Sequence, residues 1–254
     1  MNTMRLEREG SVAVLRLDKA RGNSIDQAFV DDLAAVCRDL SADDGARGLL
    51  IASANPKLFC PGLDLVTLVG YDRPALQGFM LAFSEAIAAL YGLRLPVLAG
   101  VNGHAVAGGC ILALAADYRI LRRGAQIGLN EVRIGVPLPW SIAVLLKATA
   151  PPPALSRIAL LGRNFADEEA LAAGLADELA EPAGFEEACR ARMSEFVEKD
   201  LHAFAVTKGY LRGSVLGEMR SREREAIGDF LDGWFSEPTQ ARIRKTVEAL
   251  GSRS

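Results

Sequence analysis

Short apolar runs separated by polar turns dominate the first part of the chain, and their length predicts buried β-strands. Residues 11–20 (SVAVLRLDKA) and 48–54 (GLLIASA) are two such runs, each bounded by polar or turn-forming residues. Residues 96–101, 118–121 and 125–129 repeat the pattern. We therefore expect a series of short strands before residue 130.

Between these predicted strands, apolar residues recur at helical spacing, which predicts helices. After residue 24, apolar positions recur in steps of three and four and make one helical face: Ile25, Phe29, Leu33, Val36 and Leu40. Ser24, followed three residues later by Gln27, fits a capping box, so this helix is expected to begin there. Residues 75–91 and 109–116 form further apolar helices. Alternating strands and helices indicate parallel crossover units and an α/β fold.

The second half of the chain reads as almost entirely helical. The three prolines at 151–153 end the helix before them, and a new helix is expected to start at Pro153. A further short helix opens at Asp167 and can close at Gly174. The remaining helices are predicted at 139–150, 182–199, 202–212, 215–235 and 238–250. We divide the chain into a core, residues 1–195, and a C-terminal helical region, residues 196–254, that packs on the core or between subunits.

Composition narrows the functional classes. The chain has 254 residues, half of them hydrophobic, and a net charge of −3, so it fits one large domain with a sizeable core. This acidic balance argues against a nucleic-acid partner, which needs clustered cations. No apolar run is long enough for a membrane span, and residues 1–10 lack the apolar stretch of a secretory signal.

The cysteines and histidines indicate a reducing compartment and no metal centre. Four cysteines lie far apart without a Cys-x-x-Cys pair, and the chain has only two histidines. We therefore expect free thiols, a cytoplasmic protein and no zinc site. The Gly-x-Gly-x-x-Gly fingerprint of dinucleotide binding is also absent from the sequence.

Two glycine-containing segments could present main-chain N–H groups to a ligand. Gly62-Leu63 lies in FCPGLDL (59–65), and Gly108-Gly109 opens an apolar helix, where free N–H groups and the positive end of the dipole favour an anion. Two such donors can stabilise the oxyanion that forms when a thioester loses an α-proton. The same glycines also fit an ordinary turn and close helix packing.

A single carboxylate accompanies these segments. Glu131 follows the apolar run at 125–129 and precedes an apolar loop, and a carboxyl group in a dry pocket has a raised pKa, which suits proton transfer near neutral pH. Taken alone, Glu131 fits a surface residue paired with Arg133 or a neighbouring basic residue better, because charged side chains usually face solvent.

In order and spacing, these segments resemble the crotonase (enoyl-CoA hydratase/isomerase) superfamily over nearly the whole chain. The matching segments are DKARGNSID, FCPGLDL, NGHAVAGGC, DYRIL, IGLNEVRIGVP and LLGRNFADEEALAAGLADELA. The resemblance implies a crotonase (ClpP-like) spiral of repeated ββα units in two roughly perpendicular sheets, with a C-terminal helical layer. It also implies homotrimers or dimers of trimers, with residues 196–254 as the trimerisation region.

The same resemblance assigns the site. Glu131 falls on the position of the isomerase base, and the N–H groups of Leu63 and Gly108 on the oxyanion hole. The residues expected to contact coenzyme A or the acyl group are Lys19, Arg21, Pro61, Gly62, Leu63, Asp64, Leu65 and Gly108. Asp64 can also cap the segment that follows it. No cofactor is implied, because coenzyme A is part of the substrate.

One departure from the hydratase pattern favours an isomerase. Hydratases of this family use a second glutamate three positions after the oxyanion glycine, where this chain has Ile111. A single base that removes a proton from C2 and returns it at C4 needs no water, and an isoleucine keeps that face dry. We therefore expect an enzyme that converts 3-enoyl-CoA to 2-enoyl-CoA, closest to the monofunctional isomerases. A hydratase or other crotonase-type enzyme is the first alternative, and a non-catalytic CoA-binding protein is the second.

Overall fold

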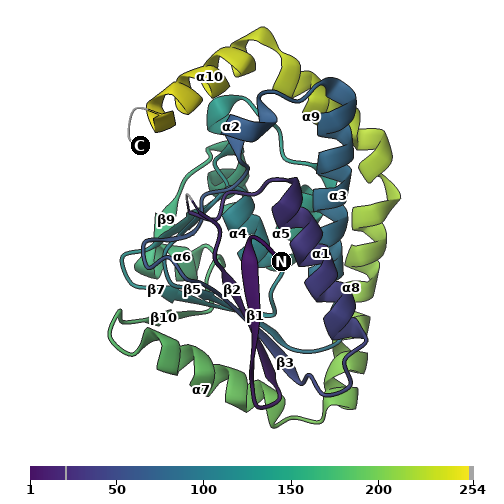
Figure 1. Cartoon of the computed structure of the whole chain (residues 1–254), viewed down its shortest axis with the longest axis vertical. Coiled ribbons are helices and arrows are strands. Elements are labelled where there is room, and N and C mark those ends of the chain that lie inside the picture. Colours follow the sequence, from purple (N-terminus) through teal and green to yellow (C-terminus); the bar gives the residue numbers. More distant parts are fainter. Residues whose placement is uncertain (21, 252–254) are drawn as a thin grey trace.

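Two β-sheets wrapped by helices form the molecule in the computed structural model, which describes residues 1–20 and 22–251 (Figure 1). The larger sheet has six strands, and only its first pair is antiparallel. In spatial order its strands are β1 (Met4–Glu9), β2 (Val12–Leu17), β3 (Gly48–Ser53), β5 (Val97–Val101), β7 (Tyr118–Arg122) and β10 (Glu178–Ala180).

In each repeat of the spiral, the chain passes from a strand of the larger sheet to a strand of the smaller sheet. Its strands are β4 (Leu58–Cys60), β6 (His104–Val106), β8 (Gln126–Gly128) and β9 (Phe165–Ala166), and only β9 runs antiparallel. Strands β3, β5 and β7 each continue into β4, β6 and β8, and a helix follows each pair. This strand–strand–helix path, repeated three times, confirms the predicted spiral of ββα units.

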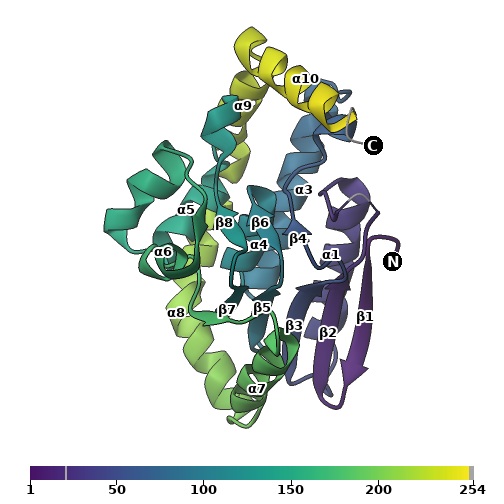
Figure 2. The ribbon, with the colours of Figure 1, turned by 90° about the vertical axis from the view of Figure 1, so that its left-hand side faces the viewer.

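The helices lie outside these sheets, with one exception (Figure 2). Those of the first half are α1 (Gln27–Ser41), α2 (Leu65–Leu68), α3 (Arg73–Tyr91), α4 (Gly108–Leu114), the 3₁₀ turn η1 (Glu131–Ile134) and α5 (Trp140–Thr149). The exception is α4, in which every residue is buried, against β4, β6 and α5. A short, fully apolar helix can lie there because none of its side chains needs water.

The later helices lie on several sides of the two sheets (Figures 1 and 2). They are η2 (Pro152–Ala154), η3 (Ser156–Leu160), α6 (Asp167–Ala172), α7 (Phe185–Val197), α8 (Leu201–Ser221), α9 (Glu223–Phe235) and α10 (Glu237–Gly251). Helix α8 packs along α3 and α5, and α10 crosses the end of the molecule near α2 (Figure 1). None of the described helices is long and apolar enough to span a membrane.

The predicted start of the first helix was wrong. Helix α1 begins at Gln27, and its N-cap is Asp26, which accepts a hydrogen bond from the N–H of Phe29 at 3.0 Å. The chain stays extended through Ile25 because Ile25 forms a parallel bridge with Leu63. The Ser24 hydroxyl, expected to cap the helix, instead donates to Asp64 at 3.0 Å.

The boundary between helices α8 and α9 also differs from the predicted one, because of tertiary contacts. The predicted break near residue 213 is absent, and α8 continues to Ser221. The Arg212 guanidinium donates to three buried main-chain carbonyls and stacks on the Tyr91 ring at 4.0 Å, so the helix is anchored to the core directly beside Gly213. The break falls instead before Glu223, a buried carboxylate that accepts from Ser84 and from the N–H of Ser141.

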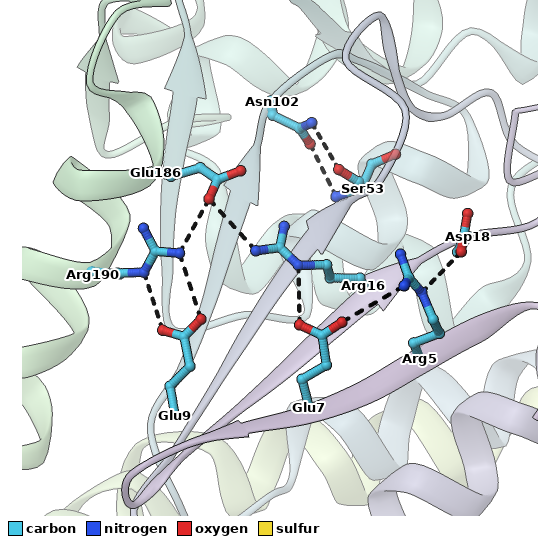
Figure 3. Close-up of polar contacts among 9 residues, drawn as sticks. All are labelled: Arg5, Glu7, Glu9, Arg16, Asp18, Ser53, Asn102, Glu186 and Arg190. Carbon is cyan, nitrogen blue, oxygen red and sulfur yellow. Dashed lines mark hydrogen bonds and ion pairs between the residues drawn. The ribbon is translucent and has the colours of Figure 1, made fainter.

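Strand β1 was not predicted, because its sequence, MRLERE, is mostly charged and exposed. It pairs with β2 along its whole length, and ion pairs join this hairpin to α7 (Figure 3). Arg190 on α7 reaches Glu9 at 3.1 Å, and Glu186 reaches Arg16 at 3.5 Å. Exposed pairs of this kind contribute little stability each, about 1 kcal/mol at most, so they orient the edge rather than drive folding.

Gly109 is where the fold tolerates substitution least. A Cβ atom built at Gly109 would lie 2.0 Å from the carbonyl oxygen of Cys60, whereas one at Gly78, inside α3, meets nothing within 4 Å. We predict that Gly109→Ala lowers the free energy of unfolding by roughly 3 kcal/mol, because backbone must move. Gly78→Ala is the control and should raise it by about 0.5–1 kcal/mol. Urea titrations would measure both, and equal stability of wild type and Gly109→Ala would contradict the close contact.

Candidate active site

A cavity of about 200 Å³ lies between α3, α4, η1, α9 and α10. Most of its wall is apolar, and these residues are Leu63, Leu65, Met80, Phe83, Ile111, Ile134, Val136, Pro139 and Phe230. Among the described residues, Glu131 is the one carboxylate in the wall, and no Lys, Arg or His lines it. The site is therefore a mostly apolar pocket with a single carboxylic acid.

Glycine contacts bring the two predicted donor segments together at this cavity. A Cβ at Gly62, whose φ is +100°, would lie 3.1 Å from the Gly108 nitrogen, and one at Gly108 would lie 3.2 Å from Cα of Gly62. The two backbones thus touch directly, which any larger residue at either position would prevent. Ala107, just before α4, also has a positive φ of 50°, so the chain turns sharply into the helix there.

Both predicted oxyanion donors remain available. Leu63 and Gly108 line the cavity, and no hydrogen bond from either main-chain N–H is found within residues 1–20 and 22–251. Their neighbours are engaged instead: Asp64 donates its N–H to Ile25 at 2.8 Å, and Ala107 donates to Gly128 at 2.8 Å. Two unpaired amides beside one cavity can bind an oxygen that gains negative charge.

Glu131 opens the η1 turn and faces the same cavity. Its Oε2 atom is buried and has no hydrogen-bond partner in the described chain. Burial raises the pKa of the Glu131 carboxyl to about 7, against a weaker lowering effect from its own main-chain N–H. The turn ends at Gly135 in the left-handed region, and α10 packs on it through a hydrogen bond from Thr239 to the Gly135 carbonyl.

The residue at the hydratases' second carboxylate position, Ile111, also lines the cavity and is 3 % exposed. Val136 and Pro139 also line the cavity with apolar side chains. Hydrogen bonds and charges act more strongly in such a low-dielectric space than in water. No partner for an attacking water is offered by these three side chains.

The predicted coenzyme A residues divide into two groups. Pro61 and Leu65 line the cavity with Leu63 and Gly108. Asp64 caps α2, as predicted, and accepts from the N–H of Thr67 at 3.2 Å.

Lys19 lies outside this lining and is engaged in internal ion pairs. Its ammonium contacts Asp26 at 2.7 Å and Asp64 at 3.4 Å, and it donates to the Ser24 carbonyl at 2.7 Å. In this arrangement Lys19 ties the segment before α1 to the Leu63 loop. Arg21 lies outside the described residues.

Sequence reasoning missed the part of the cavity that comes from the C-terminal helices. Phe230 and Trp234 on α9, and Thr246 on α10, line it, more than a hundred residues after Leu63 and Gly108. The sequence predicts a helix over residues 215–235 that packs on the core or between subunits. Nothing in that pattern distinguishes a cavity wall from ordinary core.

The spiral fold and this site together define the class: the chain has the crotonase fold, with a buried carboxylate beside two free main-chain amides. Residues 7–240 match the model of the enoyl-CoA hydratase/isomerase family, so the protein belongs to that family. The chain is 29% identical over 246 residues to rat mitochondrial enoyl-CoA delta isomerase 1, covering 96% of this chain and 85% of the relative.

Two further relatives show the range of the family. The solved structure of human mitochondrial delta3-delta2-enoyl-CoA isomerase superposes with a TM-score of 0.94 at 26% identity, and the match covers 100% of both chains. Carnitinyl-CoA dehydratase from Escherichia coli is 29% identical over 211 residues, covering 83% of this chain and 80% of the relative.

Burying Glu131 should cost stability at high pH. The folded-state pKa of about 7 lies above the usual value of 4.5, so the folded protein binds the proton more tightly than the unfolded chain does. Stability should therefore fall as pH rises from about 4.5 to 7 and stay low above that.

We predict that Glu131→Gln is more stable than wild type at pH 8, by up to about 3 kcal/mol, and equally stable at pH 4. Denaturant unfolding at both pH values measures the difference. A variant with the same stability as wild type at pH 8 would show that the carboxyl group is not buried.

Proposed function

We propose that this protein is an enoyl-CoA isomerase that moves a double bond from C3 to C2 of an acyl-CoA, with Glu131 as the proton shuttle. The observation that carries the proposal is Glu131, the lone carboxylate in a mostly apolar cavity, whose Oε2 atom is buried and unpaired, with Ile111 in place of a second acid. The unpaired amides of Leu63 and Gly108 beside the same cavity support it.

In the proposed reaction, the thioester oxygen accepts hydrogen bonds from the N–H groups of Leu63 and Gly108. The Glu131 carboxylate removes a proton from C2, the C2–H bond breaks, and its electron pair delocalises through C3=C4 and onto the oxygen as a dienolate. Glu131, now protonated, delivers the same proton to C4, so a C4–H bond forms and the double bond lies between C2 and C3. Preorganised amide donors can supply several kcal/mol of stabilisation at this oxyanion.

The environment of Glu131 suits both halves of this shuttle. A general base works best when its pKa lies near the working pH, and burial brings the pKa of Glu131 to about 7. Because the wall around it is apolar, a proton held on Glu131 has few routes to solvent. The proton is then returned to the substrate instead of being exchanged with water.

The cavity volume fits the reacting acyl part rather than a whole acyl-CoA. At about 200 Å³ it is below the range of roughly 300–1,000 Å³ that encloses drug-sized ligands. We propose that coenzyme A extends outward past Pro61, Gly62, Asp64 and Leu65, with Lys19 near that path. Hydration of a 2-enoyl-CoA is the competing reaction, favoured by the similarity to a carnitinyl-CoA dehydratase.

Replacing the base should remove the activity. We predict that Glu131→Gln, which keeps the size but not the basicity of the side chain, lowers kcat for a 3-enoyl-CoA by at least about 100-fold. A spectrophotometric assay of 2-enoyl-CoA formation measures it. Glu168→Gln is the matched control, because Glu168 is an exposed surface carboxylate paired with Arg123, and it should keep wild-type turnover. Wild-type protein that hydrates 2-enoyl-CoA but leaves 3-enoyl-CoA unchanged would exclude the isomerase.

The pH dependence follows from the same group. Only the ionised carboxylate can accept the C2 proton, so kcat/KM for a 3-enoyl-CoA should rise with pH and level off above an apparent pKa near 7. Initial rates at low substrate from pH 5 to 9 give this profile. A rise centred near the ordinary glutamate pKa, at about 4.3, would argue against a desolvated base.

A further inference from the structure

The carboxyl group of Glu131 has no hydrogen bond to another residue that would fix its direction. Its Oε2 atom is buried without a partner in the described chain, and the hydrogen bond that its carboxyl group does receive comes from its own main-chain N–H. A group that transfers a proton must still be placed accurately, because a misplacement of about 1 Å can cost roughly 100-fold in rate. The backbone that carries Glu131 therefore has to supply much of the positioning.

One peptide group links that backbone to α10. The N–H of Val136 donates to the Glu131 carbonyl at 3.1 Å. The carbonyl of Gly135 belongs to the same peptide group, and it accepts a hydrogen bond from the Thr239 hydroxyl at 3.1 Å. Because a peptide group is planar and rigid, fixing its oxygen also fixes its N–H. The Thr239 hydroxyl is thus joined to the Glu131 main chain through two hydrogen bonds and one rigid plane.

The packing around this peptide group is close. Gly135 has a φ of +85°, and a Cβ atom there would lie 2.5 Å from Oγ1 of Thr239 and 2.9 Å from Nη1 of Arg242. Thr239 is 2 % exposed, so water has little access to its hydroxyl. Two residues further on, a Cβ atom at Gly233 in α9 would lie 2.6 Å from the Pro137 ring. The segment that follows η1 is therefore packed directly against both C-terminal helices.

Loss of the Thr239 hydroxyl would release this peptide group. A partly buried carbonyl without its donor is unfavourable, so the peptide group would rotate toward another donor or toward water. Rotation carries the Val136 N–H away from the Glu131 carbonyl. Because η1 is a single 3₁₀ turn of four residues, it has little structure of its own to resist this movement.

We propose that Thr239 is a positioning residue for the reaction: through the Gly135–Val136 peptide group, its hydroxyl holds the turn that directs the Glu131 carboxyl group at the substrate. Thr239 is not among the described residues that line the cavity, so its effect passes through the turn. This inference rests on the proposed function, because it takes Glu131 to be the base. It goes further by assigning the placement of that base to a side chain of the last helix.

Removing the hydroxyl without changing the shape of the side chain tests this role. Thr239→Val should lower kcat for a 3-enoyl-CoA about 10-fold or more and change KM less than about 3-fold, because the cavity wall is intact but the base is misplaced. Thr239→Ser, which keeps the hydroxyl, should restore kcat to within about 3-fold of wild type. Thr239→Ala also lacks the hydroxyl and adds no bulk, so it provides the same test if Thr239→Val does not fold.

Gln240→Met is the matched control on the same helix. The Gln240 side chain donates to the Trp234 carbonyl at 2.8 Å, a bond that ties α10 to α9 and does not involve the turn. Its loss should leave kcat close to the wild-type value. The inference is overturned if Thr239→Val keeps wild-type kcat or if Thr239→Ser fails to restore it. It is also overturned if Gln240→Met lowers kcat as much as Thr239→Val, because docking of α10 alone would then explain the effect.

A second measurement does not depend on turnover. Loosening the turn should admit water to the Glu131 carboxyl group and lower its pKa from about 7 toward the ordinary value. The stability gained by Glu131→Gln at pH 8 should then be smaller in the Thr239→Val background than with Thr239 present. An equal gain in both backgrounds would overturn the inference. Wild type that is inactive on every 3-enoyl-CoA contradicts the proposed function, whereas this comparison still decides whether Thr239 positions Glu131.

Discussion

Direct backbone contact between the Gly62 loop and the start of α4 is the constraint on which the rest of the site depends. A Cβ atom at Gly109 would overlap the Cys60 carbonyl, and one at Gly108 would lie only 3.2 Å from Cα of Gly62. This contact brings strand β4 and helix α4, more than 40 residues apart, to the same edge of the cavity. The amides of Leu63 and Gly108 beside this contact have no hydrogen-bond partner within the described residues, whereas the neighbouring amides of Asp64 and Ala107 do.

The same packing makes the ionised form of the Glu131 carboxyl group unfavourable. The carboxyl group lies in a wall without a compensating cation, so its ionised form is less stable there than in water. Such an arrangement lowers the stability of the fold, and it persists because α10 and the Gly135 turn hold η1 in place. A base that is weakly solvated and rigidly held is suited to taking and returning one proton.

Several features of the site could be predicted from the sequence. The glycine segments and the lone acid could be found from residue type and spacing, and the structure brings Leu63, Gly108, Ile111 and Glu131 to one cavity. Lys19 shows the limit of this reasoning. A lysine beside a predicted binding loop suggests a phosphate contact, but only the folded chain reveals two aspartates next to its ammonium. The roles of these residues, the trimer, the division at residue 195 and the cytoplasmic setting stay predictions.

The sequence alone determined the order of strands and helices in the spiral, because hydrophobic periodicity is a local property that neighbouring residues impose on one another. Tertiary structure decided where elements end and what surrounds the acid. Helix α1 starts late because Ile25 bridges to Leu63, and α8 continues through Gly213 because Arg212 is anchored in the core. The far wall of the cavity, Phe230 and Trp234, comes from a distant helix. Contacts between segments far apart in the chain leave no periodic signal, so no local pattern could place them.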